Sequence, residues 1–201
     1  MTGGAHAGGG PARMRILRTD DLVLEPQVAA HAPEMFELLS DPVLSEYLDS
    51  PPPPNVGWLT ERFAKLETRL SGDGREHWLN WVVRAPVQGQ VGRAPGRGLV
   101  GFVQATVCPD GSANVAYVLG RGFWGHGWAT QATAAMLREL ADHYAVRRAF
   151  ATVDKRNLRS IRLLERLAFS LAPDLHQEHG AAEGDWLFRR DPLFTGSAPA
   201  V

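Results

Sequence analysis

The sequence contains a single cysteine, Cys108, among its 201 residues. One cysteine forms no disulfide within the chain and cannot build a cysteine-rich zinc site. Because no nucleophile motif surrounds it, we interpret Cys108 as a small, partly buried apolar residue. The seven histidines show no recognised metal-ligand spacing, since His176 and His179 stand three apart in a predicted loop. We therefore expect no metal site.

The chain also lacks an excess of either charge and any long apolar run. Lysine and arginine number 21 and aspartate and glutamate 22, so the formal net charge is −1. Nucleic-acid binding needs a concentrated basic surface and is not expected. No segment reaches the roughly 18 apolar residues of a membrane span, and residues 1–11 lack the apolar stretch of a secretory signal. These absences predict a cytoplasmic protein without membrane contact.

Length and composition predict one globular domain. An apolar content of 44% is ordinary for such proteins, and 201 residues leave little room for two full domains. Residues 1–13 are rich in glycine and alanine, while residues 195–201 are small and polar. We expect both to be flexible tails on a single domain at 14–194, which could be a monomer or a homodimer.

Hydrophobic patterns predict the order of the elements. Strands are expected at 22–24, 78–84, 99–107, 113–119, 148–153, 169–172 and 185–190. Helices are expected at 30–40, at 55–70 with Asn55 as the cap, at 128–144 and at 158–167. Strands come first and then alternate with helices, which predicts an α/β fold with a mixed, mostly antiparallel sheet of about six to seven strands and about four helices. Asp41-Pro42 is expected to end the first helix. Residues 85–98 are expected to form a solvated loop.

The most informative segment follows a predicted strand and opens the helix at 128–144. Gly120, Gly122, Gly125 and Gly127 fall within eight residues of one another. Glycines let successive backbone N–H groups turn into one concavity, and the following helix adds its positive end. The segment therefore predicts a phosphate or pyrophosphate site. The same glycines could instead serve only a tight connection between a strand and a helix.

Two common nucleotide sites do not fit this segment. A Walker loop needs Gly-Lys-Ser/Thr at the helix start, and here Gly127 is followed by Trp128 and Ala129. A dinucleotide fingerprint needs other glycine spacings and an acidic residue about 20 positions on, and Asp154 is too distant. Neither nucleotide site is therefore expected.

Three segments carry a resemblance to a known family. Trp124-Gly-His-Gly-Trp-Ala-Thr-Gln-Ala132 resembles the coenzyme-A-binding loop of the GNAT superfamily, more narrowly its Rim-type branch, named for ribosomal-protein N-acetyltransferases. The stretch Asn157-Leu-Arg-Ser160, continuing to Phe169, is similar to the branch's Asn-x-x-Ser helix and stands at the family's distance downstream. Residues 22–42 give a weaker match, and together the three cover nearly the whole ordered chain.

The sequence departs from the family pattern at three positions. Gly122 stands where the family often has glutamine or arginine, and Gln131 replaces the usual glutamate. Ala168 replaces the glycine before Phe169, so we expect that helix end not to be left-handed. None of these changes removes the backbone cradle.

The resemblance implies a GNAT-type fold and an acyl-CoA-dependent N-acetyltransferase. Acetyl-CoA would be the co-substrate, and a primary amine would attack it directly in a ternary complex. Strand 115–119 would splay from its neighbour and offer backbone groups to the pantetheine arm. The expected coenzyme contacts are Tyr117, Val118, Leu119, Gly122, Phe123, Trp124, Gly125, His126, Gly127, Trp128, Ala129, Thr130, Asn157 and Ser160. Among these, Asn157 would hydrogen-bond the pantetheine and Ser160 would approach the thioester sulfur.

The catalytic groups depart from the commonest family pattern. Many GNAT enzymes have a tyrosine seven residues after the helix asparagine, and this chain has Leu164 there. Ser160 is therefore the candidate partner of the departing thiolate, with a solvated first-turn serine as the alternative. Relatives often carry a glutamate on the strand before the cradle, where this chain offers Asn114. A strand N–H near Val118 or Leu119 would polarise the carbonyl.

No strong base is evident, although a water chain could end on Glu76, His77 or Asp154. Removing a proton from a lysine amine at pH 7 costs roughly 4.6 kcal/mol, against about 1 to 1.4 kcal/mol for an α-amine. An α-amine of a peptide or protein, or a small molecule of similar acidity, is therefore the expected acceptor. A non-catalytic acyl-CoA sensor, and a transferase for a larger group such as succinyl with the basic loop 85–98 as its contact, are the alternatives.

Overall fold

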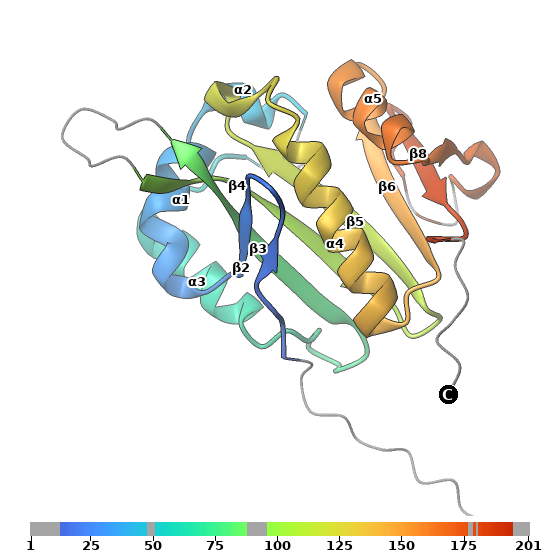
Figure 1. Ribbon diagram of the computed structural model, residues 1–201, viewed down its shortest axis with the longest axis horizontal. Helices are drawn as coiled ribbons and strands as arrows, with labels where there is room; N and C mark the ends of the chain where they lie inside the picture. Colours follow the sequence, from blue (N-terminus) through green and yellow to red (C-terminus); the bar gives the residue numbers. More distant parts are fainter. Residues whose placement is uncertain (1–12, 48–50, 88–95, 177–178, 180, 195–201) are drawn as a thin grey trace, which may run out of the picture.

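The computed structural model describes residues 13–47, 51–87, 96–176, 179 and 181–194. Eight strands form one sheet in the order β1-β2-β3-β4-β5-β6-β8-β7 (Figure 1). The strands are β1 (Leu17–Arg18), β2 (Val23–Pro26), β3 (His77–Val87), β4 (Gly96–Val107), β5 (Ser112–Leu119), β6 (Arg148–Asp154), β7 (Ser170–Leu171) and β8 (Asp185–Arg190). The helices are α1 (Ala32–Leu39), α2 (Pro42–Ser45), α3 (Val56–Leu66), α4 (Trp128–Tyr144) and α5 (Leu158–Arg166).

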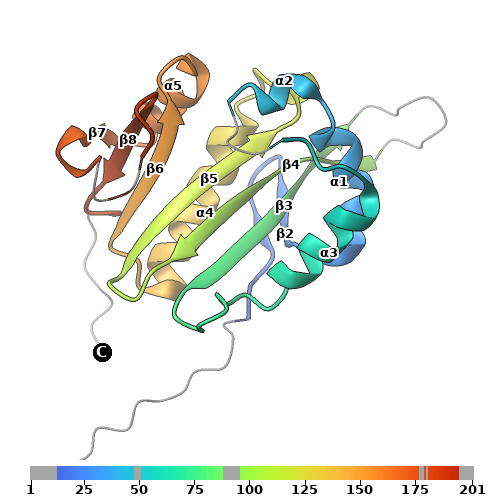
Figure 2. The ribbon, with the colours of Figure 1, turned by 180° about the vertical axis from the view of Figure 1, so that it is seen from behind.

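The helices cover the sheet on both faces. Helices α4 and α5 lie on the face that Figure 1 shows in front, and α1 and α3 lie on the face seen in Figure 2. The larger core cluster packs α4 and α5 against the strands through residues such as Leu137, Leu140 and Leu164. A second cluster, which includes Met35 and Phe63, packs α1 and α3 against the other face. Each helix buries one apolar stripe, as the sequence patterns predict.

Strands β5 and β6 separate before β5 ends. They pair in parallel at Ser112↔Arg148, Ala113↔Ala149 and Asn114↔Phe150. Beyond Asn114, β5 continues to Leu119 paired with β4 alone among the described strands. The two strands therefore diverge (Figure 2), and this confirms the splay that the resemblance implies.

The predicted sheet type is confirmed, and two short elements add to the expected count. Strand β1 has two residues, too few to show an alternating pattern. Helix α2 begins at Pro42, although the pair Asp41-Pro42 was expected only to end a helix. The Asp41 side chain accepts a hydrogen bond from the Val43 N–H at 3.0 Å, and Pro42 occupies the first turn. An Asp-Pro pair therefore ends α1 and also starts α2, because both residues favour helix N-termini.

The second predicted helix has the predicted start and an earlier end. Asn55 caps α3, since its side-chain oxygen accepts from the Trp58 N–H at 2.8 Å. The helix ends at Leu66, four residues before the predicted Leu70. Arg69 adopts a positive φ of 60°, outside the right-handed helical region, so the helix has ended before the glycines that follow.

The predicted loop 85–98 is wrong at both of its ends. Ala85 pairs with Gly98 and Pro86 with Arg97, so β3 and β4 extend into the segment. Strand β2 pairs with β3 only as far as Arg84. The missing N–H of Pro86 therefore leaves no β2 carbonyl without a donor. Residues 88–95, like most of the predicted tails 1–13 and 195–201, lie outside the described residues.

The expectation for Ala168 is also wrong. Its φ is 59°, in the left-handed region. This conformation lets the Phe169 N–H return to the Leu164 carbonyl at 3.0 Å while the Ala168 N–H meets Glu165 at 2.9 Å. Phe169 is then buried, 4% exposed, in the larger core. Satisfying the last carbonyls of α5 and burying Phe169 outweigh the steric cost of the alanine Cβ.

Candidate active site

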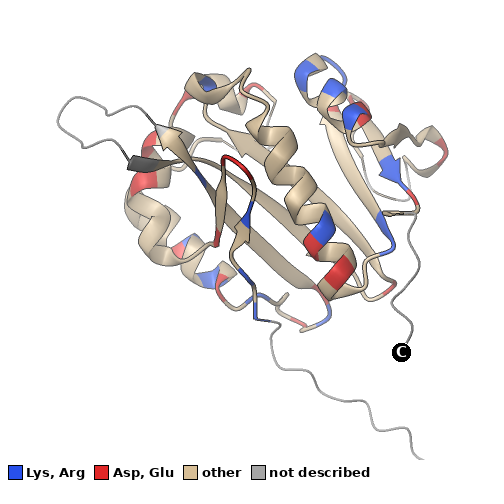
Figure 3. Cartoon of the chain, viewed as in Figure 1, with Lys and Arg blue, Asp and Glu red and all other residues tan. Residues whose placement is uncertain are grey.

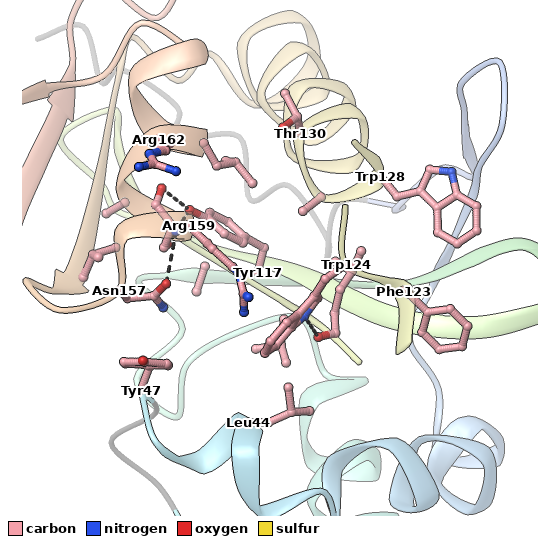
Figure 4. Close-up of a pocket in the computed structure, with 18 of the residues that line it drawn as sticks. Leu44, Tyr47, Tyr117, Phe123, Trp124, Trp128, Thr130, Asn157, Arg159 and Arg162 are labelled. Carbon is pink, nitrogen blue, oxygen red and sulfur yellow. Dashed lines mark hydrogen bonds between the residues drawn. The ribbon is translucent and has the colours of Figure 1, made fainter. Parts of the chain in front are cut away.

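A cavity of about 540 Å³ opens where β5 and β6 diverge. Its walls come from segments that are far apart in the sequence (Figure 4). They are the end of β5, the end of β6, the glycine bend (residues 120–127, between β5 and α4) with the first turn of α4, one face of α5, and residues Val43, Leu44 and Tyr47 in and after α2. All of the predicted coenzyme contacts except Gly122 and His126 therefore border one space.

The glycine bend presents backbone to this cavity. Gly125 and Gly127 have positive φ angles of 86° and 75°. A Cβ built on either glycine would meet no atom within 4 Å, so the space above the bend is open. Both residues line the cavity, together with Phe123 and Trp124.

Helix α4 starts at this bend with unsatisfied N–H groups. No side chain caps it, and the Gln131 N–H donates to the Gly127 carbonyl at 3.1 Å. The preceding N–H groups of Trp128, Ala129 and Thr130 therefore have no partner within the helix. All three residues line the cavity. Free amides, the helix dipole and open space over glycine suit a diphosphate, so the residues present fit the coenzyme.

The free edge of β5 also faces the cavity. The Gly120 N–H donates to the Val100 carbonyl of β4 at 2.9 Å. Hydrogen-bonded positions alternate along an antiparallel pair, so the Val118 N–H is directed to β4 and those of Tyr117 and Leu119 to the opposite edge. Of the two carbonyl-polarising positions expected from the sequence, only Leu119 has this direction. The Leu119 carbonyl accepts from the Trp124 indole N–H at 2.8 Å and fixes that ring beside the bend.

A tyrosine and a serine meet inside the cavity. The Tyr117 hydroxyl lies 2.7 Å from Ser160 Oγ and 3.2 Å from the Ser160 carbonyl oxygen, to which it can donate. Tyr117, labelled in Figure 4, comes from β5. Ser160 lies in the first turn of α5. Burial raises the pKa of Tyr117 to about 12, although its hydrogen bond with Ser160 acts the other way. The phenol therefore keeps its proton at neutral pH.

Asn157 is the cap of α5. Its side-chain oxygen accepts from the Ser160 N–H at 3.1 Å. This bond commits Oδ1 to the protein, so the amide nitrogen Nδ2 is the group available to a ligand. The cap also fixes the backbone of Ser160, while the contact with Tyr117 holds the serine hydroxyl.

Three predicted site residues do not reach the cavity. Gly122 and His126 are exposed and are not among its lining residues. The His126 ring contacts the carbonyls of the bend itself and stacks on Trp128 at 4.6 Å. Asn114, the candidate catalytic residue, sits where β5 still pairs with β6. Because strands advance about 3.3 Å per residue, Asn114 lies roughly 10 Å along the strand from Tyr117.

Two of the three candidate bases also lie away from the cavity. Glu76 and His77 lie at the start of β3, where His77 pairs with Val107 and contacts Tyr144 at the far end of the sheet. Asp154 does line the cavity. Its hydrogen bonds with Arg156 lower its pKa to about 2, so it is a charged group but a weak proton acceptor.

A comparison with protein families identifies the domain. Residues 21–170 match the family described as Acetyltransferase (GNAT) domain. This chain belongs to the GNAT acetyltransferase family. The match contains the glycine bend and the α5 motif, and it ends one residue after Phe169. The acyl-CoA-dependent N-acetyltransferase function expected from the sequence follows from this membership, whereas the search of curated proteins gives no match.

Solved structures share the fold of this GNAT domain at low sequence identity. A RimL ribosomal L7/L12 α-N-protein acetyltransferase in complex with coenzyme A has a TM-score of 0.71 and 18% identity, covering 88% of this chain and 98% of that one. An acetyltransferase from Salmonella typhimurium that modifies the N-terminal serine of L7/L12 gives 0.68 and 17%, covering 88% and 99%. The microcin C7 self-immunity acetyltransferase MccE, in complex with acetyl-CoA and AMP, gives 0.64 and 16%, covering 86% and 93%.

The GNAT resemblance predicted Tyr117 only as a backbone contact, and its hydroxyl was missed. The sequence held one signal for it. Tyr117 lies in the strand expected to splay, two residues after Val115, which is buried. Alternation places both side chains on the α4–α5 face. Leu164, where many relatives have a tyrosine, is fully buried in the core.

Proposed function

We propose that this acetyltransferase moves an acetyl group from acetyl-CoA to a primary amine by direct attack within a ternary complex. The observation that carries the proposal is that the uncapped start of α4 and the Tyr117–Ser160 pair border the same cavity. An anion site at one end and a proton-donating pair at the other suit a substrate with a diphosphate and a leaving group that needs a proton.

Each part of the cavity then has a role. When bound, acetyl-CoA supplies an acetyl group activated as a thioester. The amides of Gly125–Thr130 hold the diphosphate, and Asn157 Nδ2 with the free edge of β5 holds the pantetheine arm. The Leu119 or Tyr117 N–H faces the acetyl carbonyl. Ser160 Oγ donates its proton to the leaving sulfur as the C–S bond breaks, and Tyr117 replaces that proton through their 2.7 Å contact. Solvent water takes up the proton that the amine loses on forming the amide and returns one to Tyr117, so the transfer ends with a neutral amide, a thiol and the pair restored.

The amine enters from the other face of the sheet. Ala116, Val118 and Thr152 alternate with the residues that face α4 and α5, so they point toward the side of α1 and α2. They line the cavity together with Leu44 and Tyr47. This side is mostly apolar among the described residues. Asp154, the one carboxylate that they contribute to the cavity wall, is ionised and can attract an ammonium group without deprotonating it.

The acceptor class follows from the weakness of the available bases. Asp154 is a poor base, and neither Glu76 nor His77 reaches the cavity. An α-amine loses its proton at neutral pH far more readily than a lysine amine. We therefore propose a peptide or protein N-terminus, or a small amine of similar acidity. The cytoplasmic location and the choice between monomer and homodimer stay predictions.

Release of free thiol from acetyl-CoA tests the activity directly. Purified protein is incubated with acetyl-CoA and a panel of peptides that differ only in a free or blocked N-terminus, with small amines alongside. Thiol release that depends on the free α-amine is the expected result. Tight coenzyme binding without acceptor-dependent release would support a sensor instead, and faster release from succinyl-CoA would support the larger acyl group.

The variant Gly125→Glu tests the coenzyme site. Its side chain would place bulk and negative charge over the free amides, so calorimetry should detect no CoA binding at concentrations that saturate the wild type. Gly74→Glu is the matched control, because Gly74 also has a positive φ, of 72°, with no atom within 4 Å of an added Cβ. Both variants bear the same backbone strain, but only the first borders the cavity. Retained CoA affinity in Gly125→Glu contradicts the site.

A further inference from the structure

Three arginines that the transfer chemistry does not use line the same cavity. They are Arg159, Arg162 and Arg166 of α5. Spacings of three and four residues put them on one face of the helix. At about 1.5 Å rise per residue, this arginine stripe extends over roughly 10 Å. Figure 3 shows the basic residues gathered on α5, and Figure 4 shows Arg159 and Arg162 beside the cavity.

The arginine stripe carries positive charge that no carboxylate of the described residues offsets. None of the ion pairs among the described residues involves an arginine of the stripe. The arginines that do form them are Arg15, Arg75, Arg84, Arg148 and Arg156. The carboxylate nearest in the cavity wall, Asp154, is held by Arg156 at 2.6 Å. A cavity wall with several uncompensated guanidinium groups attracts an anion.

The stripe is longer than one diphosphate requires. The Arg159 guanidinium lies 4.5 Å from the centre of the Trp124 ring, next to Gly125, so it belongs to the diphosphate end of the cavity. Arg162 and Arg166 are displaced from Arg159 by roughly 4.5 and 10 Å along the helix axis. A second anionic group, separate from the diphosphate, would place both of them in contact with the ligand.

The position of the arginine stripe indicates which ligand carries this second anionic group. Helix α5 lies on the same face of the sheet as α4, opposite the side by which the amine is proposed to enter. The anion therefore belongs to the coenzyme rather than to the acceptor. Besides its diphosphate, coenzyme A carries a phosphate on the 3′ oxygen of its ribose.

We propose that Arg162 and Arg166 bind the ribose 3′-phosphate and make this enzyme select coenzyme A over 3′-dephospho-coenzyme A. The proposal rests on the proposed function, since it assigns a further subsite of the same coenzyme. Guanidinium groups suit a phosphate because their planar donors form paired, charge-assisted hydrogen bonds. Both side chains are exposed, so solvent and salt moderate the effect.

Calorimetry with the two coenzymes tests this selectivity. We expect the wild type to bind CoA about tenfold more tightly than dephospho-CoA at low ionic strength, with a smaller ratio as salt is added. Arg162→Gln/Arg166→Gln should weaken CoA binding by about tenfold and leave dephospho-CoA within about twofold. The control Arg62→Gln/Arg138→Gln removes the same charge from exposed positions that do not line the cavity, and it should keep the wild-type ratio.

The outcomes separate this inference from the proposed function. Equal affinity of the wild type for the two coenzymes, or an equal loss for both in the α5 double variant, overturns the 3′-phosphate site while coenzyme binding stands. A control double variant that loses the selectivity would show a general field effect and also overturn it. Absence of binding to either coenzyme would remove the proposed function together with this inference.

Discussion

Tyr117 reaches Ser160 across 43 positions of sequence, and the contact joins β5 to α5 at the point where the strands diverge. A serine alone is a weak proton donor to a departing thiolate, because its hydroxyl is far less acidic than a phenol. The half-buried Tyr117 behind it keeps its proton at neutral pH, because burial raises its pKa to about 12. On the proposed function, the pair would supply the proton that a tyrosine in the place of Leu164 supplies in many GNAT enzymes.

The variant Tyr117→Phe should lower kcat by roughly ten- to hundredfold, because it removes the hydroxyl and keeps the ring. The KM for acetyl-CoA should change little, since the ring still lines the cavity. Steady-state kinetics of thiol release measures both. Tyr144→Phe, a change to another half-buried tyrosine at the far end of α4, is the control. An unchanged kcat in Tyr117→Phe would return this hydroxyl to a structural role.

The pH profile and a double variant sharpen this test. With the pKa of Tyr117 raised to about 12, no loss of wild-type rate below about pH 10 should come from this phenol. Ser160→Ala should also lower kcat, and Tyr117→Phe/Ser160→Ala should cost less than the product of the single losses. Residues that act as one unit give such non-additive effects.

Single residues show where sequence reasoning works and where it stops. The glycine bend is local, so its backbone role could be predicted from Gly125, Gly127 and the helix that follows. The Tyr117–Ser160 contact depends on how α5 packs against β5, and no local pattern contains that information. Asn114 and the His126 side chain do not line the cavity, because adjacency to a motif in sequence does not place a side chain there. Their predicted roles in catalysis and coenzyme binding stay predictions.

At the scale of elements, the residue at the start of helix α5 suits its position and the residue at its end does not. Its start is well satisfied by the Asn157 cap. Its end places Ala168 in the left-handed region, at φ 59°, where a Cβ is unfavourable by about 1 to 2 kcal/mol. The left-handed turn is kept because it buries Phe169 and satisfies the Leu164 carbonyl.

Ala168→Gly should therefore stabilise the protein by up to about 1 kcal/mol, because the glycine adopts this φ without steric cost. Chemical denaturation gives the free energy of unfolding for each variant. Ala64→Gly, at an exposed interior position of α3, should have the opposite sign and cost roughly 0.5 to 1 kcal/mol. Destabilisation by both substitutions would show that strain at Ala168 is absent.

The elements themselves could largely be predicted, because they follow from periodicity and from terminal residues. The bounds of α4 and β8 agree with the expectation to the residue. Those missed, β1 and α2, have two and four residues, too few for a hydrophobic period to emerge. The loop expected at 85–98 was too long because glycine and proline suggested a break, whereas β3 and β4 stay paired as far as Val87↔Gly96.

At the scale of the whole molecule, the splay of β5 and β6 creates the cavity and needs a fixed point at the other end. Asp110, in the turn before β5, provides one. It accepts from the Ser112 N–H at 2.9 Å and from its hydroxyl at 2.6 Å, and it forms an ion pair with Arg148 at the start of β6. Hydrophobic patterns could not reveal the divergence of β5 and β6, and only the family resemblance implied it.

Acid should loosen this fixed point. The hydrogen bonds from Ser112, followed by the one from Arg148, lower the pKa of Asp110 from 3.8 to about 2. A carboxyl whose pKa is depressed by folding stabilises the protein above its ordinary pKa, and this contribution is lost as pH falls toward the folded value. The free energy of unfolding attributable to Asp110 should therefore decline between about pH 4 and pH 2.

Asp110→Asn removes the titrating group and should flatten that part of the pH dependence. At pH 6 the variant should be less stable than the wild type, and the difference should narrow on acidification toward pH 2. Urea denaturation at a series of pH values gives both curves, with exposed Asp142→Asn of α4 as the control that keeps the wild-type slope. Parallel curves for Asp110→Asn and the wild type would mean that the Asp110–Arg148 contact does not hold the paired end of β5 and β6. The splay would then depend on core packing alone.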